Sequence, residues 1–420
     1  MKISIPKGTK DILPGEIEKY KYIQKVYANL LENFGFKQIR FPVFEHTELF
    51  QRGVGDTTDI VQKEMYTFKD KAGRSITLRP EGTASVVRSY IENGMSSNPQ
   101  PIKLYYDITA YRYENVQKGR YREFNQLGAE VLGSDSPNAD VEILNMLNYF
   151  FSKLGIQGLK LHVNSIGCKV CRTKYNEMLK EFFADKLDDM CEDCKQRYIK
   201  NPMRLIDCKQ EKCSVISKDA PMLIDNLCDS CKEHFENVIR GLDEMNTPYI
   251  INKRIVRGLD YYVRTVFEFI AEGIGAQDTV CAGGRYDGLV EELGGTDTPG
   301  IGFAMGLERL ISTLEKSGFV LPYEKNPVIF IAYIGEKAYK VARKIANELR
   351  INGIYCEIDI NDRSLKAQLK FADKKNALYN VVLGENEIDT NKAIIKNMST
   401  QEIKEVSIDS ITKRIIENKI

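Results

Sequence analysis

Apolar residues recur at three- and four-residue steps between Ile17 and Phe34, and lysines and glutamates fill most positions between them. This spacing predicts an amphipathic helix with one buried face. A second helix is expected over residues 136–154, where SPNAD supplies a helix start and apolar residues follow at helical steps. We expect this second helix to contribute packing rather than chemistry.

Aromatic and β-branched residues dominate two stretches, 103–113 and 122–132, which flank a polar, basic segment. This pattern predicts two antiparallel strands joined by a loop. Alternation along the second strand places on one face Phe124, Gln126, Gly128 and Glu130. Because Gly128 has no side chain, we expect a polar ligand to fit over it.

Two arginines belong to this hairpin. Arg112 lies near the end of the first strand, and Arg120 lies in the loop close to Lys118. Guanidinium groups suit phosphate because they bind it in a fixed bidentate geometry. The residues leave two alternatives open, a site for a phosphate compound beside a small amine and an ordinary charged hairpin.

Residues 54–83 predict a loop followed by a second hairpin, whose turn spans 70–73. Its second strand delivers the sequence RPEGT to the start of a helix. Glu81 and Thr83 therefore sit at a strand-to-helix junction, where polar groups gather round ligands. Thr83 is also consistent with a simple helix cap.

Further strand patterns follow after residue 252. A turn at Arg257 and Gly258 is expected to lead into a strand that puts Asp260 and Tyr262 on one face and Tyr261 on the other.

The segment DTVCAGGRYDG, residues 278–288, predicts a short strand running into paired glycines that let the backbone approach a ligand. GIGFAMGLERLI, residues 300–311, predicts a strand passing into a helix that carries Arg309. Beyond residue 327, alternating strand and helix patterns span about the length of one small domain.

The chain of 420 residues is too long for one ordinary core, so we expect two or three domains. It has no apolar run of membrane-spanning length and no signal-peptide core at its N-terminus, which predicts a cytoplasmic protein without a membrane partner. The formal net charge of +1 neither requires nor excludes nucleic acid. A local basic cluster could contact RNA or form a solvated helix face, and it comprises Lys366, Lys370, Lys374 and Lys375.

Eight of the ten cysteines fall between Cys168 and Cys231, and such clustering favours metal ligands over disulfides in a cytosolic chain. Two CxxC pairs fit a structural zinc site, namely Cys168, Cys171, Cys191 and Cys194. A looser second set, with His234 just beyond it, comprises Cys208, Cys213, Cys228 and Cys231. The alternative is a helical insertion with reduced, unligated cysteines.

The segment YRYENVQKGRYREFNQLGAEVLG, residues 111–133, is similar to motif 2 of the class II aminoacyl-tRNA synthetases, and its core resembles the histidyl-tRNA synthetases. The likeness extends to RPEGT, to RGLDYY, to GGRYDG, to a motif 1 segment around Pro42 and to a motif 3 segment at 300–311. It covers nearly the whole chain apart from the cysteine-rich insertion, and metal binding there is not a general trait of this family.

The resemblance implies an α+β fold, with the antiparallel class II sheet flanked by helices, a small insertion domain and a C-terminal α/β anticodon-binding domain. The corresponding expected boundaries are 1–165 and 241–324 for the two catalytic parts, 166–240 for the insertion and 325–420 for the last domain. It also implies a homodimer that activates L-histidine with ATP and transfers it to tRNA(His), with Mg²⁺ bridging the phosphates.

The resemblance further implies residue roles. For catalysis at the α-phosphate it points to Arg112 and Arg257. For the distal phosphates of ATP it points to Arg120 and Arg309. For histidine it points to Glu81, Thr83, Gln126, Glu130, Tyr261, Tyr262 and Tyr286, with Glu130 accepting from the imidazole N–H and a tyrosine facing the other ring nitrogen.

Two rival hypotheses remain at this point. One is the non-catalytic paralogue that serves as regulatory subunit of a histidine-biosynthesis phosphoribosyltransferase, which typically loses signature residues and the C-terminal domain. The other is a zinc-stabilised RNA-binding protein without enzymatic activity. Five separate ATP-site or amino-acid-site motifs favour the synthetase over both.

Overall fold

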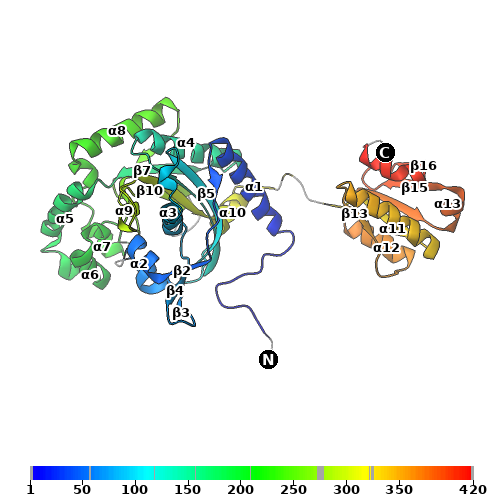
Figure 1. The fold of residues 1–420 in the computed structure, drawn as a ribbon, viewed down its shortest axis with the longest axis horizontal. Helices are drawn as coiled ribbons and strands as arrows, with labels where there is room; N and C mark the ends of the chain where they lie inside the picture. Colours follow the sequence, from blue (N-terminus) through cyan, green and yellow to red (C-terminus); the bar gives the residue numbers. More distant parts are fainter. Residues whose placement is uncertain are drawn as a thin grey trace. The chain divides into compact units, whose positions relative to one another are not determined.

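The computed structural model describes residues 3–55, 58–117, 119–156, 158–208, 210–271, 279–320, 322 and 326–417. Lys118 and Asp278, named above, lie outside these residues. The chain divides into two compact units, Met1–Val320 and Leu321–Ile420 (Figure 1). No helix among the described residues is both long and apolar enough to cross a membrane.

An eight-stranded sheet forms the centre of the first unit, in the order β1-β5-β6-β11-β10-β9-β7-β8. Its strands are β1 (Lys37–Gln38), β5 (Ile102–Tyr111), β6 (Glu123–Leu132), β7 (Leu159–Ser165), β8 (Ile250–Ile251), β9 (Val263–Ala271), β10 (Thr279–Arg285) and β11 (Gly300–Gly306). The six inner strands pair antiparallel, and only the two short outer strands pair parallel to their neighbours. The expected hairpin is confirmed as β5 and β6, with Tyr106 directly opposite Gly128.

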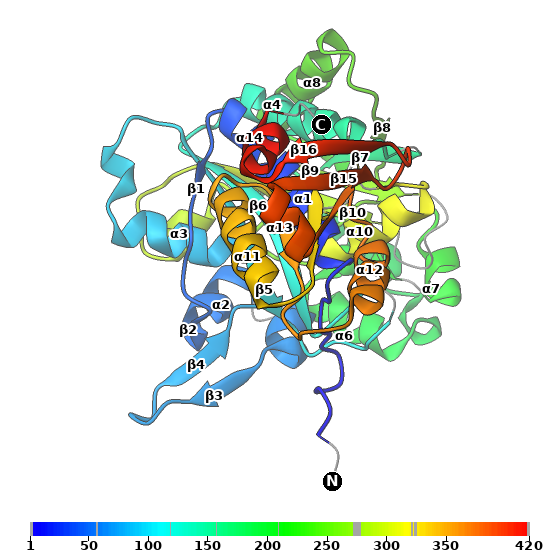
Figure 2. The same ribbon diagram turned by 90° about the vertical axis from the view of Figure 1, so that its right-hand side faces the viewer.

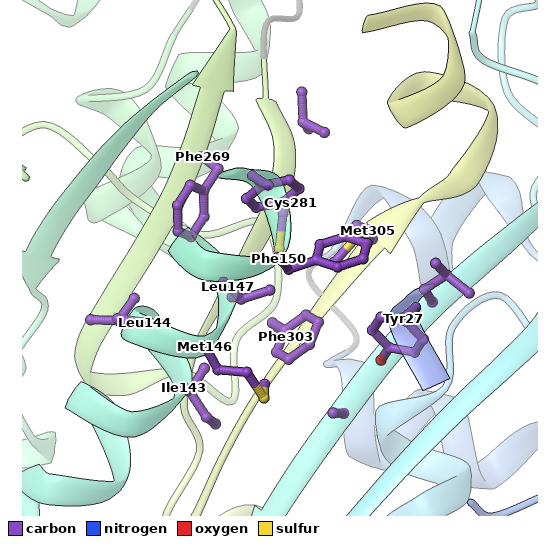
Figure 3. Packing of buried hydrophobic residues seen from close by; sticks show 14 of the residues in the cluster. Tyr27, Ile143, Leu144, Met146, Leu147, Phe150, Phe269, Cys281, Phe303 and Met305 are labelled. Carbon is purple, nitrogen blue, oxygen red and sulfur yellow. The ribbon is translucent and has the colours of Figure 1, made fainter. Parts of the chain in front are cut away.

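Helices α1 (Ile17–Asn33), α4 (Pro137–Lys153) and α10 (Leu307–Lys316) bury their apolar faces in one core with one face of this sheet. Both helices expected from apolar periodicity are therefore confirmed. Ser136 caps α4 by accepting the backbone N–H of Asn138 at 3.2 Å. Figure 3 shows the centre of this core, where Tyr27 meets Phe150 and Phe303 edge to face, at ring centroid distances of 5.7 and 6.5 Å.

Strand alternation sends neighbouring side chains of β5 to opposite sides of the sheet. Tyr105 joins the core with α1, whereas Tyr106 joins a second apolar cluster with Val86 and Val87 of α3 (Thr83–Glu92). A small sheet lies beside this second side and contains β2 (Phe44–His46), β4 (Ser75–Leu78) and β3 (Thr67–Lys69). The strand β4 runs directly toward α3, as the sequence predicts.

The cysteine-rich insertion lies between β7 and β8 and is helical. Its main elements are α5 (Lys169–Phe183), α6 (Glu192–Lys200), η4 (Pro202–Leu205), α7 (Glu211–Ile216) and α8 (Asp229–Glu244). Figure 1 shows them in green. The buried cysteines pack with Tyr175, Leu179 and Leu205 in the same apolar cluster that reaches α3.

The C-terminal unit is built on a five-stranded sheet in the order β13-β12-β14-β15-β16. Its strands are β12 (Ile329–Tyr333), β13 (Cys356–Ile358), β14 (Tyr379–Leu383), β15 (Lys392–Asn397) and β16 (Ile403–Ser407). Helices α11 (Glu336–Ile351) and α14 (Ile411–Ile416) pack on one face and α12 (Leu365–Lys374) on the other, with α13 (Glu385–Thr390) at the side of α11 (Figure 2). The expected α/β alternation is present.

Candidate active site

A cleft of about 400 Å³ opens over the ends of β6, β10 and β11. Nine of the eleven side chains expected to bind substrates line it, namely Glu81, Thr83, Arg112, Arg120, Gln126, Arg257, Tyr261, Tyr262 and Arg309. They come from four separate stretches of the chain, and the antiparallel sheet brings those stretches together. The other two, Glu130 and Tyr286, lie behind the lining.

Arg112 is fixed at the floor of this cleft. Its Nε donates to the carbonyl oxygen of Pro80 at 2.8 Å, and its guanidinium lies 5.5 Å from the ring centroid of Phe124. Burial lowers the pKa of Arg112 from its usual 12.5, while Glu64 and Glu81 oppose that effect. An arginine in this position remains charged at neutral pH.

The other three expected arginines are held by acidic or carbonyl groups. Arg120 pairs with Glu114 through its Nε and lies 3.9 Å from Glu64. Arg257 pairs with Glu268, which also accepts from the hydroxyl of Thr279 at 2.9 Å. Arg309 donates through Nη1 to the carbonyl oxygen of Thr279 at 2.7 Å. These contacts set the guanidinium positions before a ligand arrives.

Glu81, rather than Thr83, caps helix α3. Its carboxylate accepts the backbone N–H of Thr83 at 2.6 Å and that of Ala84 at 2.9 Å. Burial raises the pKa of Glu81 above its usual value, and the two N–H bonds oppose the rise. The helix-cap interpretation of Thr83 is therefore wrong, because its hydroxyl instead donates to Oε1 of Glu130 at 2.8 Å.

Glu130 forms the centre of a buried polar network. Besides Thr83, its carboxylate is approached by the hydroxyls of Tyr106 at 3.2 Å and Tyr286 at 2.6 Å. Burial raises the pKa of Glu130 to about 8, and the hydroxyl contacts only partly offset this. The network lies beneath the residues that line the cleft.

The space over Gly128 is already filled, so the expectation of a ligand there is wrong. A Cβ on Gly128 would lie 2.3 Å from the hydroxyl of Tyr106, the residue opposite it in β5. The glycine therefore admits a tyrosine of the neighbouring strand. That tyrosine in turn contacts Glu130.

Tyr261 and Tyr262 share the cleft, with ring centroids 4.6 Å apart. The sequence predicts opposite faces for them, and this is wrong because β9 begins only at Val263 and the residues before it form a turn. Burial raises the pKa of Tyr262 above its usual 10, so its hydroxyl keeps its proton at neutral pH. Asp260 does not line the cleft, but it shares a neighbouring pocket with Tyr262, the residue expected on the same face.

Several cleft residues were missed by the sequence argument. Glu64, Glu114 and Glu268 hold the arginines just described, and Arg204 reaches the cleft from the insertion. Glu114 could have been found as the acidic residue between Arg112 and Arg120. The others give no local signal, since their positions depend on chain segments far away.

The eight insertion cysteines form two groups, and the pairing differs from the one that their spacing predicts. One group is Cys168, Cys171, Cys228 and Cys231, and the other is Cys191, Cys194, Cys208 and Cys213. Beyond Cys171, helix α5 continues for 12 residues to Phe183, roughly 18 Å, and so separates the first two CxxC pairs. His234 belongs to neither group, since it contacts Asp140 at 3.3 Å.

Comparisons with known proteins identify the family of the chain. A family model for histidyl-tRNA synthetase matches residues 8–310, and one for an anticodon binding domain matches residues 328–418. The histidine–tRNA ligase of Acetivibrio thermocellus is 60% identical over 410 residues, which are 98% of each chain. That of Caldanaerobacter subterraneus is 52% identical over the same shares.

Solved structures give the same result. The crystal structure of apo histidyl-tRNA synthetase from S. aureus superposes with a TM-score of 0.85 and 41% identity, covering 99% of this chain and 100% of that one. A Bacillus halodurans protein described as an ATP phosphoribosyltransferase regulatory subunit/histidyl-tRNA synthetase shares the fold at a TM-score of 0.65 and 19% identity, over 91% and 98% of the chains. The motifs in the cleft, the family model over residues 8–310 and the full-length relatives agree, and the chain belongs to the histidyl-tRNA synthetase family.

Proposed function

We propose that the chain joins L-histidine to the 3′ end of tRNA(His) in two steps at this cleft. Histidine's carboxylate attacks the α-phosphate of ATP, which forms histidyl-adenylate and releases pyrophosphate. The terminal ribose of the tRNA then takes the histidyl group and AMP leaves. The observation that carries this proposal is the convergence of four expected arginines and a tyrosine-lined pocket on one cleft.

Arg112 and Arg257 are the proposed catalytic cations. Negative charge builds on the phosphate oxygens as the carboxylate attacks, so cations already in place stabilise the transition state without reorganising. The carbonyl oxygen of Pro80 holds Arg112, and Glu268 holds Arg257. We assign Arg112 to the α-phosphate and Arg257 to the junction of carboxylate and phosphate.

Arg120 and Arg309 are proposed to hold the distal phosphates. Among the described residues, candidate metal ligands gather in groups of three or more only at the cysteines. Mg²⁺ would therefore be held mostly by ATP itself, with one or two carboxylates of the cleft such as Glu114 and Glu308. When bound, the ion neutralises charge on the leaving pyrophosphate.

Histidine is proposed to bind between the tyrosines and the start of α3. Oε1 of Gln126 is buried in the cleft wall and has no hydrogen-bond partner among the described residues, so it can accept from the α-ammonium group. Glu81 and Thr83 lie beside it in the lining. Tyr261 and Tyr262 line the same cleft, and we assign them to the imidazole.

Glu130 and Tyr286 are proposed to act on the imidazole from behind this lining. Their mutual hydrogen bond and the contact of Glu130 with Thr83 fix the pocket wall. Glu130 can accept directly from the ring N–H only if one of its tyrosine partners turns aside. Once a tyrosine has turned aside, a substrate without an imidazole would leave the freed polar groups unpaired, which can discriminate by roughly 10⁴.

The C-terminal unit is proposed to bind the tRNA anticodon, and its relation to the family model at residues 328–418 supports this. The exposed lysines on and after α12 offer a surface for RNA phosphates. A homodimer and a cytoplasmic location are part of the same proposal. The exposed apolar side chains of Val43 and Phe44, in the motif 1 segment, are consistent with a subunit contact.

The relative described as both regulatory subunit and synthetase is 19% identical and shares the fold alone, so it does not favour a regulatory role. The arginines that a histidine-binding regulator does not need are all present here. ATP–pyrophosphate exchange by the purified chain separates the two. We expect exchange that depends on histidine and is followed by tRNA(His) charging; histidine binding without exchange would contradict the proposed enzyme.

A further inference from the structure

Each cysteine group of the insertion is compact. Within each group, the four sulfur atoms all lie within 4.8 Å of one another. Cys168 Sγ lies 3.7 Å from that of Cys171 and 3.9 Å from that of Cys228. In the other group, Cys191 Sγ lies 3.8 Å from that of Cys208.

These distances match one tetrahedral ion for each group. A zinc ion with four metal–sulfur bonds of about 2.3 Å separates its sulfurs by roughly 3.8 Å. A disulfide would bring two sulfurs to about 2.05 Å. An iron–sulfur cluster places several iron and sulfide atoms between its cysteines and needs wider spacing than this.

The backbone around the sulfurs also suits thiolate ligands. Cys168, Cys191 and Cys228 are the N-cap residues of α5, α6 and α8, and the second cysteine of each CxxC pair lies in the first turn. Helix N-termini favour negative charge. The backbone N–H of Cys228 points at Cys171 Sγ at 3.2 Å, and that of Cys191 points at Cys213 Sγ at 3.3 Å.

We propose that the insertion folds around two zinc ions held by nested four-thiolate sites. The outer site uses Cys168, Cys171, Cys228 and Cys231, and the inner site uses Cys191, Cys194, Cys208 and Cys213. The outer ion joins the start of α5 to the start of α8. The inner ion lies within the chain segment that the outer one closes. With four protein ligands, neither ion keeps an open position for substrate.

The inner site also connects the insertion to the catalytic cleft. Helix η4 lies between two inner ligands, and its Met203 and Leu205 are buried with Cys194 and Cys208. Arg204, between them, lines the cleft, and its Nε is buried without a hydrogen-bond partner among the described residues. The inner zinc thus holds Arg204 where it can bind a substrate phosphate, from ATP or from the tRNA end.

Elemental analysis tests whether the chain binds two zinc ions. Full-length protein purified without chelator should contain two zinc ions per chain by elemental analysis, and a Cys356→Ala control should contain the same. A zinc content of one or fewer per chain, or iron in place of zinc, would overturn the assignment.

Double substitutions test which cysteines share a zinc site. The double variant C168S/C228S should lose one zinc, because both residues belong to the outer site. C168S/C191S should lose two, because it damages both sites. The reverse pattern would overturn the pairing in favour of sites formed by consecutive cysteines.

Alkylation mapping covers the case in which these variants fail to fold. During gradual chelation of wild-type protein, mass spectrometry should show the four inner cysteines becoming reactive together and the four outer ones as a separate set. Mixed sets would contradict nested sites.

Arg204→Ala tests the link to the cleft, with Arg197→Ala as control, since Arg197 belongs to the same insertion but does not line the cleft. We expect unchanged zinc content and a several-fold rise in KM. The rise should appear for ATP in pyrophosphate exchange if the nucleotide supplies the phosphate, and for tRNA in charging if the tRNA does. Unchanged KM for both substrates would overturn this role.

Discussion

Arginine side chains of the cleft are positioned by acidic and carbonyl partners, and this decides what a single substitution removes. Arg257 is the sharpest case, because it is half-buried and paired with Glu268. Glu268 in turn is held by Thr279. Removing the guanidinium therefore takes away a fixed positive charge and also leaves the half-buried carboxylate of Glu268 without its charged partner.

Arg257→Ala should lower histidine-dependent pyrophosphate exchange by about 10³-fold with little change in histidine affinity, because the lost interaction forms with transition-state charge. Calorimetric titration measures the affinity. The control is Arg257→Ala with Glu268→Gln, which removes the unpaired carboxylate. Exchange at the wild-type rate in the single variant would refute the role, and recovery in the double variant would assign the loss to Glu268.

Glu130 makes stability depend on pH. Its pKa of about 8 in the folded chain exceeds the ordinary value of 4.5, so the unfolded chain loses this proton first as pH rises. The stabilisation is therefore full below the ordinary pKa and is lost as pH rises toward 8. Between roughly pH 5 and 8, the free energy of unfolding should fall more steeply in wild type than in Glu130→Gln, by about 1 kcal/mol per pH unit.

Denaturant unfolding at several pH values measures this slope. Parallel curves for the two proteins would mean that Glu130 is ionised throughout the range. In that case the hydroxyls of Tyr106, Tyr286 and Thr83 would outweigh the cost of burial.

Residue types at the site were predictable where a local motif carries them. Arg112, Arg120 and Gln126 lie in one hairpin and Glu81 lies in RPEGT, and the resemblance of both stretches to the histidyl-tRNA synthetases implies that they meet. The position of Glu130 behind the lining was not predictable, because it depends on Tyr106 occupying the space over Gly128.

At the scale of elements, close strand packing at glycine controls the geometry. A Cβ on Gly302 of β11 would lie 1.7 Å from Oε2 of Glu130 in β6. A Cβ on Gly283 of β10 would lie 2.2 Å from the carbonyl oxygen of Gly302. The paired glycines of GGRYDG therefore lie within β10. Gly283 makes room for the neighbouring strand β11, and not for a ligand as the sequence predicts.

Gly302→Ala should lower the free energy of unfolding by about 3 kcal/mol and abolish exchange, because the added methyl group collides with the buried carboxylate. Gly288→Ala is the matched control, since nothing lies within 4 Å of its Cβ position. Chemical denaturation of both variants measures the difference. Equal stability of the two variants would show that β6 and β11 can separate without loss.

Elements with strong periodicity were predictable and those with long-range contacts were not. Apolar spacing gave α1 and α4, and alternation gave β5 and β6. Alternation failed at Tyr261 and Tyr262, because the strand there begins later than the pattern indicates. The cysteine pairing failed for a similar reason, since the third CxxC pair, at the start of α8, lies beside the first.

At the scale of the whole molecule, the two compact units divide the proposed work. The cleft lies entirely within the unit that ends at Val320, and the basic helix α12 lies in the other. The alternating strand and helix patterns beyond residue 327 indicated this division in the sequence. The path of the insertion toward the cleft was not visible, because nothing local marks Arg204 as a cleft residue.

Deletion of residues 321–420 should leave histidine-dependent pyrophosphate exchange within about threefold of wild type. It should lower kcat/KM for tRNA charging by at least about 100-fold, which corresponds to about 2.7 kcal/mol of lost contact with the tRNA. Parallel exchange and charging assays on both proteins measure this. An equal loss of both activities would contradict the division of labour.

The central claim is that histidine and the α-phosphate of ATP meet in the cleft between Arg112, Arg257 and the paired tyrosines. A crystal structure of the protein with a non-hydrolysable histidyl-adenylate analogue tests it most directly. We predict the phosphate mimic within hydrogen-bond distance of both arginines and the imidazole against Tyr261 and Tyr262. An analogue bound in another cavity, or with its phosphate mimic away from both arginines, would contradict the account.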